Sequence, residues 1–314
     1  MVSKMKQWCA VVGLIISLTW VVSVQAQEDP IRFNNITAED GLSSGFVQAL
    51  LKDSQGFMWF GTRDGLNRYD GYTIVTYNYD PLDTNSLSAD YVNSLYEDKD
   101  GILWIGTYGS GLNSFDPKTE TFTRYQQDDE DPTALSGTIV EAIFQDSNGT
   151  IWVGTREGGL NQLNDDGTFT HYQPDASDPN SLSGEYVTAV YEDNEGRLWI
   201  GTLGGGLNLF NPDERNFTHY QYEPRNPRSI SNNNVTSFSP ARDGLIWIGT
   251  SGGGFNLLNP DDGTFVRYTD GNTNLNDNRI DSLLQDSQGN LWIGTESKGL
   301  NRFNPNTGIF TRYQ

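Results

Sequence analysis

The hydrophobic pattern of the chain is built on one phrase, an apolar run that ends in Gly-Thr and is followed by a glycine turn. Its second copy reads Leu103-Trp104-Ile105-Gly106-Thr107, then Gly109-Ser110-Gly111 and Leu112-Asn113. The phrase recurs at intervals of 45 to 48 residues around six tryptophans: Trp59, Trp104, Trp152, Trp199, Trp247 and Trp292. This period predicts one supersecondary unit stacked six times, and a β-propeller is the leading candidate.

Each unit contains four short segments whose alternation is typical of β-strands. In the second unit we expect strands at 91–97, 102–107, 112–115 and 121–126, with the turn Asp98-Lys99-Asp100-Gly101 between the first two. No segment has helical spacing. The sequence therefore predicts an all-β fold, a β-propeller of four-stranded antiparallel blades. The six repeats are expected at about 45–80, 90–127, 137–173, 184–222, 232–269 and 277–314.

Three positions stay fixed between units and have structural explanations. Each tryptophan is expected to be buried between neighbouring blades, and the glycine two positions later to allow a backbone or ring to approach closely. A small residue recurs in the first strand of each unit, where the blades crowd together: Ala49, Ser94, Ala142, Ala189, Ser237 and Ser282. We assign these positions to the blade core and not to a site.

The start of the propeller predicts how the ring closes. Residues 31–34 look like an orphan outer strand, because every later unit is preceded by the outer strand of the unit before it. The final unit already has its own outer strand at 309–314. Six complete blades with a spare outer strand predict part of a seven-bladed ring, in which the sequence stops before the rest of the seventh blade. The alternative is a closed six-bladed ring that carries the spare strand as a fifth strand of one blade.

The first 26 residues stand apart from the repeats. Lys4 and Lys6 precede an apolar run at 8–24, and Val24-Gln25-Ala26 fits a cleavage site. This pattern predicts a secretory signal peptide over 1–26, and an exported, periplasmic propeller over 27–314. An uncleaved anchor helix is the alternative, although the run is short for a bilayer core of ~30 Å. Cys9 is the single cysteine and lies in this segment, so the mature chain has no disulfides.

The chain is strongly acidic. The full sequence has 20 basic and 41 acidic residues, and removal of Lys4 and Lys6 leaves 18 against 41, a net charge of −23. Such a charge repels nucleic acid and anionic membranes and favours cationic partners. Nucleic-acid binding through this segment is therefore excluded.

The repeats resemble the two-component regulator propeller repeat. The residues that carry the resemblance are Asp98-x-x-Gly101-x-x-Trp104-Ile105-Gly106-Thr107, Gly111-Leu112-Asn113 and Asp116-Pro117, and the segment from Glu39 to Ser44 looks like the family's usual opening. The resemblance covers about 31–314. It departs locally, with Ala241 in place of the turn aspartate and a first glycine turn, Arg63-Asp64-Gly65, that is one residue short.

The resemblance implies a function. In that family the repeats form the periplasmic sensor of bacterial membrane receptors, often as two seven-bladed propellers before a linking β-domain and a transmembrane helix. The cytoplasmic output is commonly a histidine kinase, often a hybrid, or a diguanylate cyclase. Oligosaccharides are frequent ligands. None of the output segments occurs in these residues, and a homodimer is one possible state of the receptor.

The candidates for metal chemistry are weak. His171 and His219 occupy one position of the fourth strand in adjacent units, where other units carry arginine, so surface packing explains them better than a metal pair. The turns at 98–101 and 146–149 lack the alternating ligands and closing glutamate of a calcium loop. The acidic run at 128–131 is best interpreted as solvated. We predict no metal and no cofactor.

Known propeller enzymes do not fit the sequence either. Sialidases need an arginine cluster with a tyrosine–glutamate pair, and streptogramin lyases need a metal with a histidine base; neither set is evident by position. No serine–histidine–aspartate set has any specificity. We predict no catalytic residue in this chain.

A binding face remains. The turns between second and third strands should lie on the same side of the ring as the loops that lead into the first strands. The residue after each Gly-Thr varies, and we predict that these residues form a ligand-binding ring around the central mouth: Arg63, Tyr108, Arg156, Leu203, Ser251 and Glu296. Tyr91 and Tyr186 could add stacking surfaces from the same side. The alternative is that these loops vary because little constrains them.

Three functions are compatible with these features. The first is a periplasmic sensor propeller that binds a small molecule or oligosaccharide within a larger receptor. The second is a free-standing secreted binding or scaffold protein. The third is a propeller lyase or glycosidase. The family resemblance favours the first.

Overall fold

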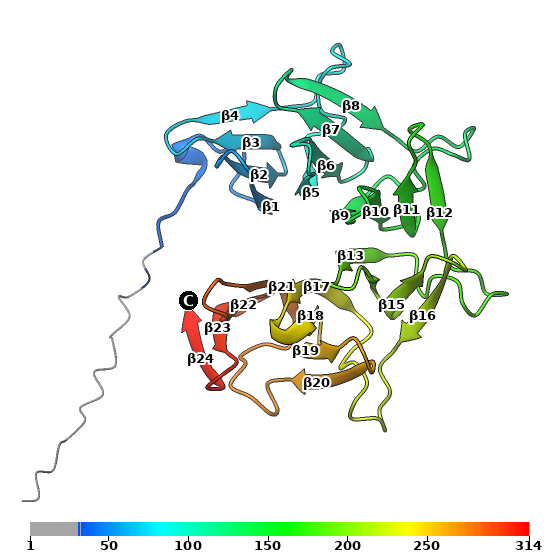
Figure 1. Cartoon of the computed structure of the whole chain (residues 1–314). Coiled ribbons are helices and arrows are strands. Elements are labelled where there is room, and N and C mark those ends of the chain that lie inside the picture. Colours follow the sequence, from blue (N-terminus) through cyan, green and yellow to red (C-terminus); the bar gives the residue numbers. More distant parts are fainter. Residues whose placement is uncertain (1–30, 32, 314) are drawn as a thin grey trace, which may run out of the picture. The chain divides into compact units, whose positions relative to one another are not determined.

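The computed structural model describes residue 31 and residues 33–313, and the predicted signal peptide lies outside them. From Ile36 onward the chain forms one compact unit. Its strands make six four-stranded sheets, each of four consecutive antiparallel strands. Figure 1 shows the six sheets around a common centre, with the first strand of each innermost and the fourth outermost. The predicted all-β propeller of four-stranded blades is confirmed.

The strands follow the repeats in order. Blade one contains β1 (Val47–Lys52), β2 (Met58–Thr62), β3 (Gly65–Tyr69) and β4 (Ile74–Tyr77). Blade two contains β5 (Val92–Glu97), β6 (Leu103–Thr107), β7 (Leu112–Asp116) and β8 (Thr121–Tyr125). Blade three contains β9 (Val140–Gln145), β10 (Ile151–Thr155), β11 (Leu160–Leu163) and β12 (Phe169–Tyr172).

The second half repeats the arrangement. Blade four contains β13 (Val187–Glu192), β14 (Leu198–Thr202), β15 (Gly206–Asn211) and β16 (Asn216–Tyr220). Blade five contains β17 (Val235–Pro240), β18 (Ile246–Thr250), β19 (Gly254–Asn259) and β20 (Thr264–Tyr268). Blade six contains β21 (Ile280–Gln285), β22 (Leu291–Thr295), β23 (Gly299–Asn304) and β24 (Ile309–Tyr313).

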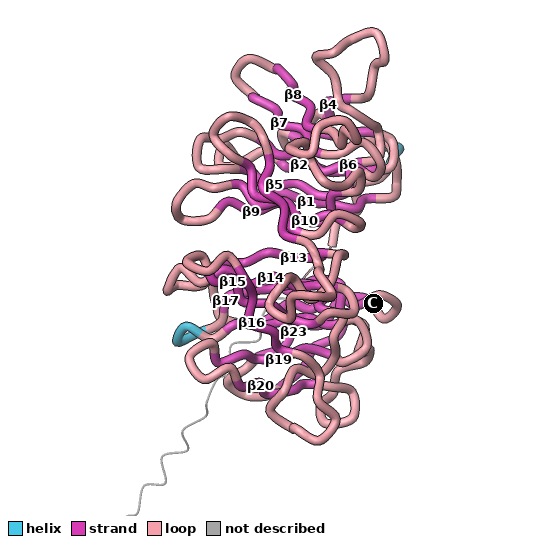
Figure 2. The backbone as a smooth tube through the Cα atoms, turned by 90° about the vertical axis from the view of Figure 1, so that its right-hand side faces the viewer, coloured by secondary structure: helices cyan, strands magenta, loops and turns pink. Residues whose placement is uncertain are grey.

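Loops occupy the two ends of the blades. In the side view of Figure 2 the strands lie in the middle and the loops on both sides. The short helix η1 (Ala38–Asp40) leads into the first blade on one side, and η2 (Arg242–Gly244), in the turn between β17 and β18, lies on the other. We call the side of η1 the mouth and the side of η2 the base.

The tryptophans of the repeat pack between neighbouring blades. Trp199 has no exposed surface and contacts β17 and β18 of the next blade through Val235 and Ile248. Trp59, Trp104, Trp152 and Trp247 are buried in the same way. Trp292 of blade six is only partly buried. The repeat core is therefore made at the contacts between blades.

The turn aspartate at the base has a specific role. Asp98 Oδ1 accepts hydrogen bonds from the backbone N–H groups of Asp100 (3.0 Å) and Ile102 (2.9 Å), and its Oδ2 accepts from Trp104 Nε1 (2.8 Å). Asp53, Asp146, Asp193 and Asp286 make the same bond to their tryptophans. One carboxylate thus closes the turn and satisfies the buried indole.

The repeat glycines make room for the next blade. A Cβ on Gly154 would lie 2.5 Å from Val187 Cγ1, and one on Gly61 would lie 2.6 Å from Val92 Cγ1. The neighbour is a β-branched side chain of the following innermost strand and not the expected backbone or ring. At Gly294 in blade six the nearest atoms belong to Ser282 of the same blade.

The loops that cross between blades are held by side chains of the third and fourth strands of the next blade. Asn113 on β7 accepts the Ser88 N–H (2.9 Å) and donates to its hydroxyl (2.9 Å). On β8, Arg124 donates to the Ser86 carbonyl. His171 and His219 occupy the same position as Arg124, and each ring nitrogen Nε2 lies 2.7 Å from a loop carbonyl oxygen. Because a carbonyl only accepts, each ring donates from Nε2, so both histidines hold loops.

The two end blades have more exposed faces than the others. Leu50 on β1 is 62% exposed and Leu284 on β21 is 66% exposed, whereas the equivalent side chains of the intervening blades are covered by a neighbour. The expected seventh blade stays a prediction, and these two faces are the surfaces that it would cover.

The structure pairs the predicted orphan outer strand at 31–34 with none of the six blades, and the segment stays a prediction. Ile31, Phe33 and Asn34 are assigned to no strand. A lone segment becomes a strand only beside a partner that offers a free edge. Each described sheet has four strands, so none of them carries this segment as a fifth.

Candidate functional site

Backbone hydrogen bonds bring the predicted ring positions together at the mouth. The residue after Gly-Thr donates its N–H to the residue that precedes the innermost strand of the same blade, as from Tyr108 to Tyr91 (2.9 Å) and from Leu203 to Tyr186 (2.9 Å). The glycine turn also bonds to the following blade, as from Gly109 to the Thr138 carbonyl (3.1 Å). The expectation that these turns and loops share one side of the ring is therefore correct.

Five of the eight predicted site residues lie in one continuous stack across blades one to four. We call this stack the Arg–Tyr ladder, and its members are Phe46, Arg63, Tyr91, Tyr108, Arg156 and Tyr186. The Arg63 guanidinium carbon lies 3.7 Å from the centre of the Phe46 ring and 5.6 Å from that of Tyr91. The Tyr91 and Tyr108 rings stack with centres 4.8 Å apart and planes inclined by 15°.

Arg156 joins the second half of the ladder. Its guanidinium carbon lies 4.9 Å from the Tyr108 ring centre and 5.0 Å from the Tyr186 ring centre. One guanidinium nitrogen also donates to the Tyr108 hydroxyl (3.0 Å). A cation between two aromatic faces is a favourable arrangement. The inner faces of the ladder cover one another, so the ladder presents alternating ring edges and guanidinium groups, with Phe46 46% and Tyr108 40% exposed.

The carboxylate of Glu141 on β9 holds the ladder in position. It accepts from Arg156 Nε (2.9 Å), from the Tyr186 hydroxyl (2.8 Å) and from Asn93 Nδ2 (3.0 Å). Its side chain is only 17% exposed. Three residues from three blades therefore meet at the Glu141 carboxylate, which holds Arg156 and Tyr186 in position.

The electrostatics follow from this arrangement. Burial would lower the pKa of Arg156, but the hydrogen bond and charge of Glu141 outweigh it and raise that pKa above its ordinary value. Burial, with the charge of Glu141 beside it, raises the pKa of Tyr186 to about 12. Arg156 is therefore a permanent cation at neutral pH, and Tyr186 a permanent hydrogen-bond donor.

The remaining predicted ring residues lie outside the ladder. Leu203 is 42% exposed on blade four, and Ser251 bonds to the backbone of Asn234. Glu296 pairs with Arg279 (3.1 Å). The predicted ring therefore has two unlike halves, an aromatic and cationic half on blades one to four and a smaller, polar half on blades five and six.

The sequence reasoning missed a second set of residues at the centre. Each innermost strand carries a bulge, in which one residue lies unpaired between two pairs with the second strand. The bulge residues are Gln48, Asn93, Glu141, Thr188, Thr236 and Asp281. A bulge redirects a side chain out of the regular alternation and is common next to functional sites.

The bulge residues link neighbouring blades. Asn93 donates to the Val140 carbonyl (2.9 Å) and Thr188 to the Val235 carbonyl (2.7 Å), each on the next innermost strand. Burial, with the charges of Glu296 and Asp277, raises the pKa of Asp281. The signal in the sequence was a polar residue in every unit between an aliphatic residue and the small one.

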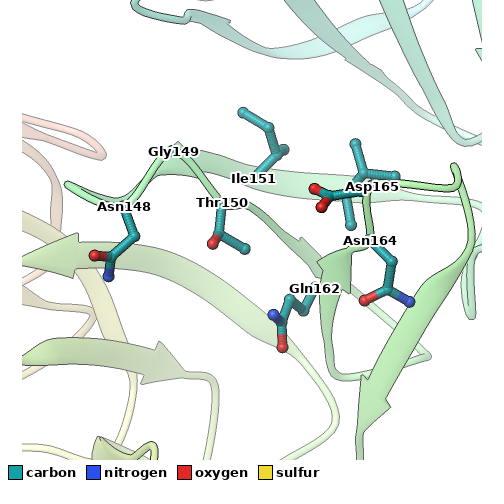
Figure 3. Close-up of a pocket in the computed structure, with 8 residues that line it drawn as sticks. Asn148, Gly149, Thr150, Ile151, Gln162, Asn164 and Asp165 are labelled. Carbon is teal, nitrogen blue, oxygen red and sulfur yellow. The ribbon is translucent and has the colours of Figure 1, made fainter.

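A pocket of about 520 Å³ opens at the base of blade three, away from the ladder (Figure 3). It lies between the turn at Asn148–Thr150 and the hairpin at Asn164 and Asp165. Asn164 is already bonded to Thr168 (2.9 Å). Over the described part of the chain, no group of three or more His, Cys, Asp or Glu residues could hold a metal ion. We assign the candidate site to the ladder.

Comparisons with known proteins agree with the repeat. The family profile of the two-component regulator propeller matches residues 41–64, 86–109, 134–157, 181–204, 229–252 and 274–297. The histidine kinase P4 of Formosa agariphila is 41% identical over 66 residues, which are 21% of this chain and 5% of the kinase. The chain thus spans a small part of that relative.

Solved structures give the same result. The extracellular domain ascribed to a hybrid two-component system of B. thetaiotaomicron, BT3049, is 31% identical, with a TM-score of 0.76 over 90% of this chain and 36% of that one. Virginiamycin B lyase of Staphylococcus aureus has a TM-score of 0.64 over 85% of this chain and 84% of its own, at 16% identity, which shows a shared fold alone.

Within the described residues, no helix has the length and apolar character that a membrane crossing requires. The six profile matches fall on the six blades, and each contains the bulge residue and the residue after Gly-Thr described above. The chain belongs to the two-component regulator propeller family.

Proposed function

We propose that this propeller is the ligand-sensing segment of a bacterial signal-transduction receptor, a hybrid sensor histidine kinase or a diguanylate cyclase. The family membership supports this proposal, as do a kinase and the extracellular domain of a two-component system among the relatives. The same relatives support a location outside the cytoplasm, which agrees with export by the predicted signal peptide. In the full receptor, further blades, a membrane anchor and the output domain are the partners of this segment.

The ladder is the surface that we propose to bind the ligand, and its geometry is the observation that carries the proposal. Partly exposed aromatic rings with a hydroxyl at one edge offer apolar contact and hydrogen bonds together. Two arginines among them can bind carboxylate or hydroxyl oxygens. An oligosaccharide has both an apolar face and a dense set of oxygens, so the ladder suits a sugar chain that runs from blade one to blade four.

We propose that this segment binds without turnover. The two histidines of the chain donate to loop carbonyls, and the candidate site consists of stacked rings and paired charges. The likeness to virginiamycin B lyase reaches the fold only, and it gives no reason to assign that activity to this chain.

Calorimetric titration with short neutral and uronic-acid oligosaccharides tests the proposal. We expect one class to bind, and Tyr108→Ala and Arg156→Ala each to weaken binding by roughly 10-fold through loss of a stacking partner. Tyr222→Ala is the matched control, because Tyr222 is 42% exposed and lies beneath Arg267 at 5.2 Å, outside the ladder.

Two results would contradict the proposal. If ligand affinity were unchanged in both ladder variants, the site would lie elsewhere on the propeller. If the oligosaccharide recovered after the titration were cleaved, the chain would be an enzyme and not a sensor segment.

A further inference from the structure

Blade five lacks the turn carboxylate that the other blades share. In five blades an aspartate six residues before the tryptophan accepts the indole N–H at 2.8 to 2.9 Å. In blade five this position is Ala241. The partner tryptophan, Trp247, is 2% exposed and packs in the same way as its equivalents. Blade five therefore keeps the buried tryptophan but lacks the carboxylate that accepts its N–H in the other blades.

The indole N–H of Trp247 has no acceptor within the described part of the chain. Among the described residues its Nε1 is one of the few buried polar side-chain atoms without a hydrogen-bond partner. A buried donor that lacks both water and a protein acceptor is costly. An acceptor from outside the chain would remove this cost.

A pocket occupies the place of the missing side chain. It has a volume of about 230 Å³ and is lined by Ala241, Arg242, Trp247, Tyr268 and Asn306, among others. The volume is ample for a molecule of a few heavy atoms. The pocket lies at the base, where blades five and six meet, and is separate from the ladder.

The lining of the pocket also includes a cationic side chain. The Arg242 guanidinium makes two long hydrogen bonds, to the Asn306 side-chain oxygen (3.4 Å) and to the Gln288 carbonyl (3.3 Å), and both acceptors are neutral. None of the ion pairs between described residues includes Arg242. The lining also contains one acidic residue, Asp243, which is exposed.

We propose that this pocket binds a small carboxylate, such as acetate or propionate, in place of the missing aspartate side chain. One carboxylate oxygen accepts the Trp247 Nε1–H, as aspartate does in the other blades, and the other faces Arg242. A carboxylate fits better than a neutral acceptor because charge-assisted bonds to both donors are stronger. The site is independent of the proposed ligand of the ladder.

The test follows the indole N–H directly. Protein labelled with ¹⁵N-tryptophan is titrated with sodium acetate against sodium chloride of equal ionic strength. We expect the Trp247 indole peak to shift and saturate, with a dissociation constant on the order of 1–10 mM. The Trp199 peak should stay in place, because Asp193 already accepts the hydrogen bond of that indole N–H. The peak is assigned by its displacement in Ala241→Asp.

Two variants make the result decisive. Ala241→Asp supplies the carboxylate within the chain, so it should raise the melting temperature and lower acetate affinity by roughly 10-fold or more. Asp98→Ala in blade two removes the acceptor of the Trp104 indole, and Lys99 follows this position as Arg242 follows Ala241, so the Trp104 peak of this variant should respond to acetate. This variant also shows that the assay detects such a site.

The proposal is overturned if the Trp247 peak does not respond to acetate while that of Trp104 in Asp98→Ala does, because water alone would then satisfy the blade-five indole. It is also overturned if Ala241→Asp binds acetate as well as the unaltered chain does.

Discussion

Replacement of Trp199 by alanine tests whether the contacts between blades hold the propeller together. The side chain has no exposed surface and packs against blade five. Burial of 150–250 Å² at ~25 cal/mol/Å² corresponds to roughly 4–6 kcal/mol as an upper value. Asp193 would lose the indole bond but keep Arg197 Nε at 2.7 Å, so the remaining carboxylate is not left unpaired. We expect Trp199→Ala to lower the free energy of unfolding by about 3–5 kcal/mol.

Blade six offers the matched control. Trp292 occupies the equivalent position and makes the same bond to its turn aspartate, at 2.9 Å, but its side chain is only partly buried. Because less apolar surface is removed from water, Trp292→Ala should cost roughly half as much as Trp199→Ala. The comparison isolates the neighbouring blade, since the chemistry of the two substitutions is identical.

Urea unfolding followed by far-ultraviolet circular dichroism measures both costs. Thermal melting of the same proteins provides a second measure, and a change in the urea slope would show that the blades no longer unfold together. Equal losses for the two variants, or a loss below about 1 kcal/mol for Trp199→Ala, would refute the argument that the contacts between blades supply the stability.

Two further predictions concern close packing and pH. Gly154→Ala should lower stability by about 1–3 kcal/mol, because its Cβ would meet Val187 Cγ1 at 2.5 Å; Gly294→Ala should cost less in the same melting assay, since only the rotatable Ser282 hydroxyl lies nearby. Burial raises the pKa of Tyr186 to about 12, so the folded state keeps this proton between about pH 10 and 12 while the unfolded state loses it. The free energy of unfolding should fall across that window, and it should fall less steeply in Tyr186→Phe. The same pH dependence in both proteins, measured by urea unfolding at each pH, would contradict this.

The regular parts of the fold were predictable because they are local. Alternation with period two and a preceding glycine turn predicted a strand at 112–115, and the structure has it at Leu112–Asp116. The segment at 31–34 alternates equally well, but a strand also needs a partner edge, and alternation does not encode one. The role of the turn aspartate was readable in part, from its constant spacing to the tryptophan and its single replacement by Ala241.

The sequence predicted single residues of the candidate site but not the contacts between them. The variable residue after Gly-Thr identified Tyr108 and Arg156 one at a time. The contacts of Arg156 with Tyr108 and Tyr186 depend on the angle between blades, which no short-range pattern specifies. The bulges were missed because alternation treats every strand as regular, and the unpaired residue, as at Glu141, was then assigned to an ordinary strand position.

The bulge in each innermost strand has a consequence for how such a propeller can diversify. The unpaired residue takes no part in the cross-strand pairing of its blade, so its side chain can change while that pairing is kept. In this chain the six bulge residues are Gln48, Asn93, Glu141, Thr188, Thr236 and Asp281, and no more than two of them are of the same type. Duplication and exchange of whole repeats would change the set of bulge residues around the axis. A lineage could therefore acquire a new ligand preference while it keeps the fold of each blade.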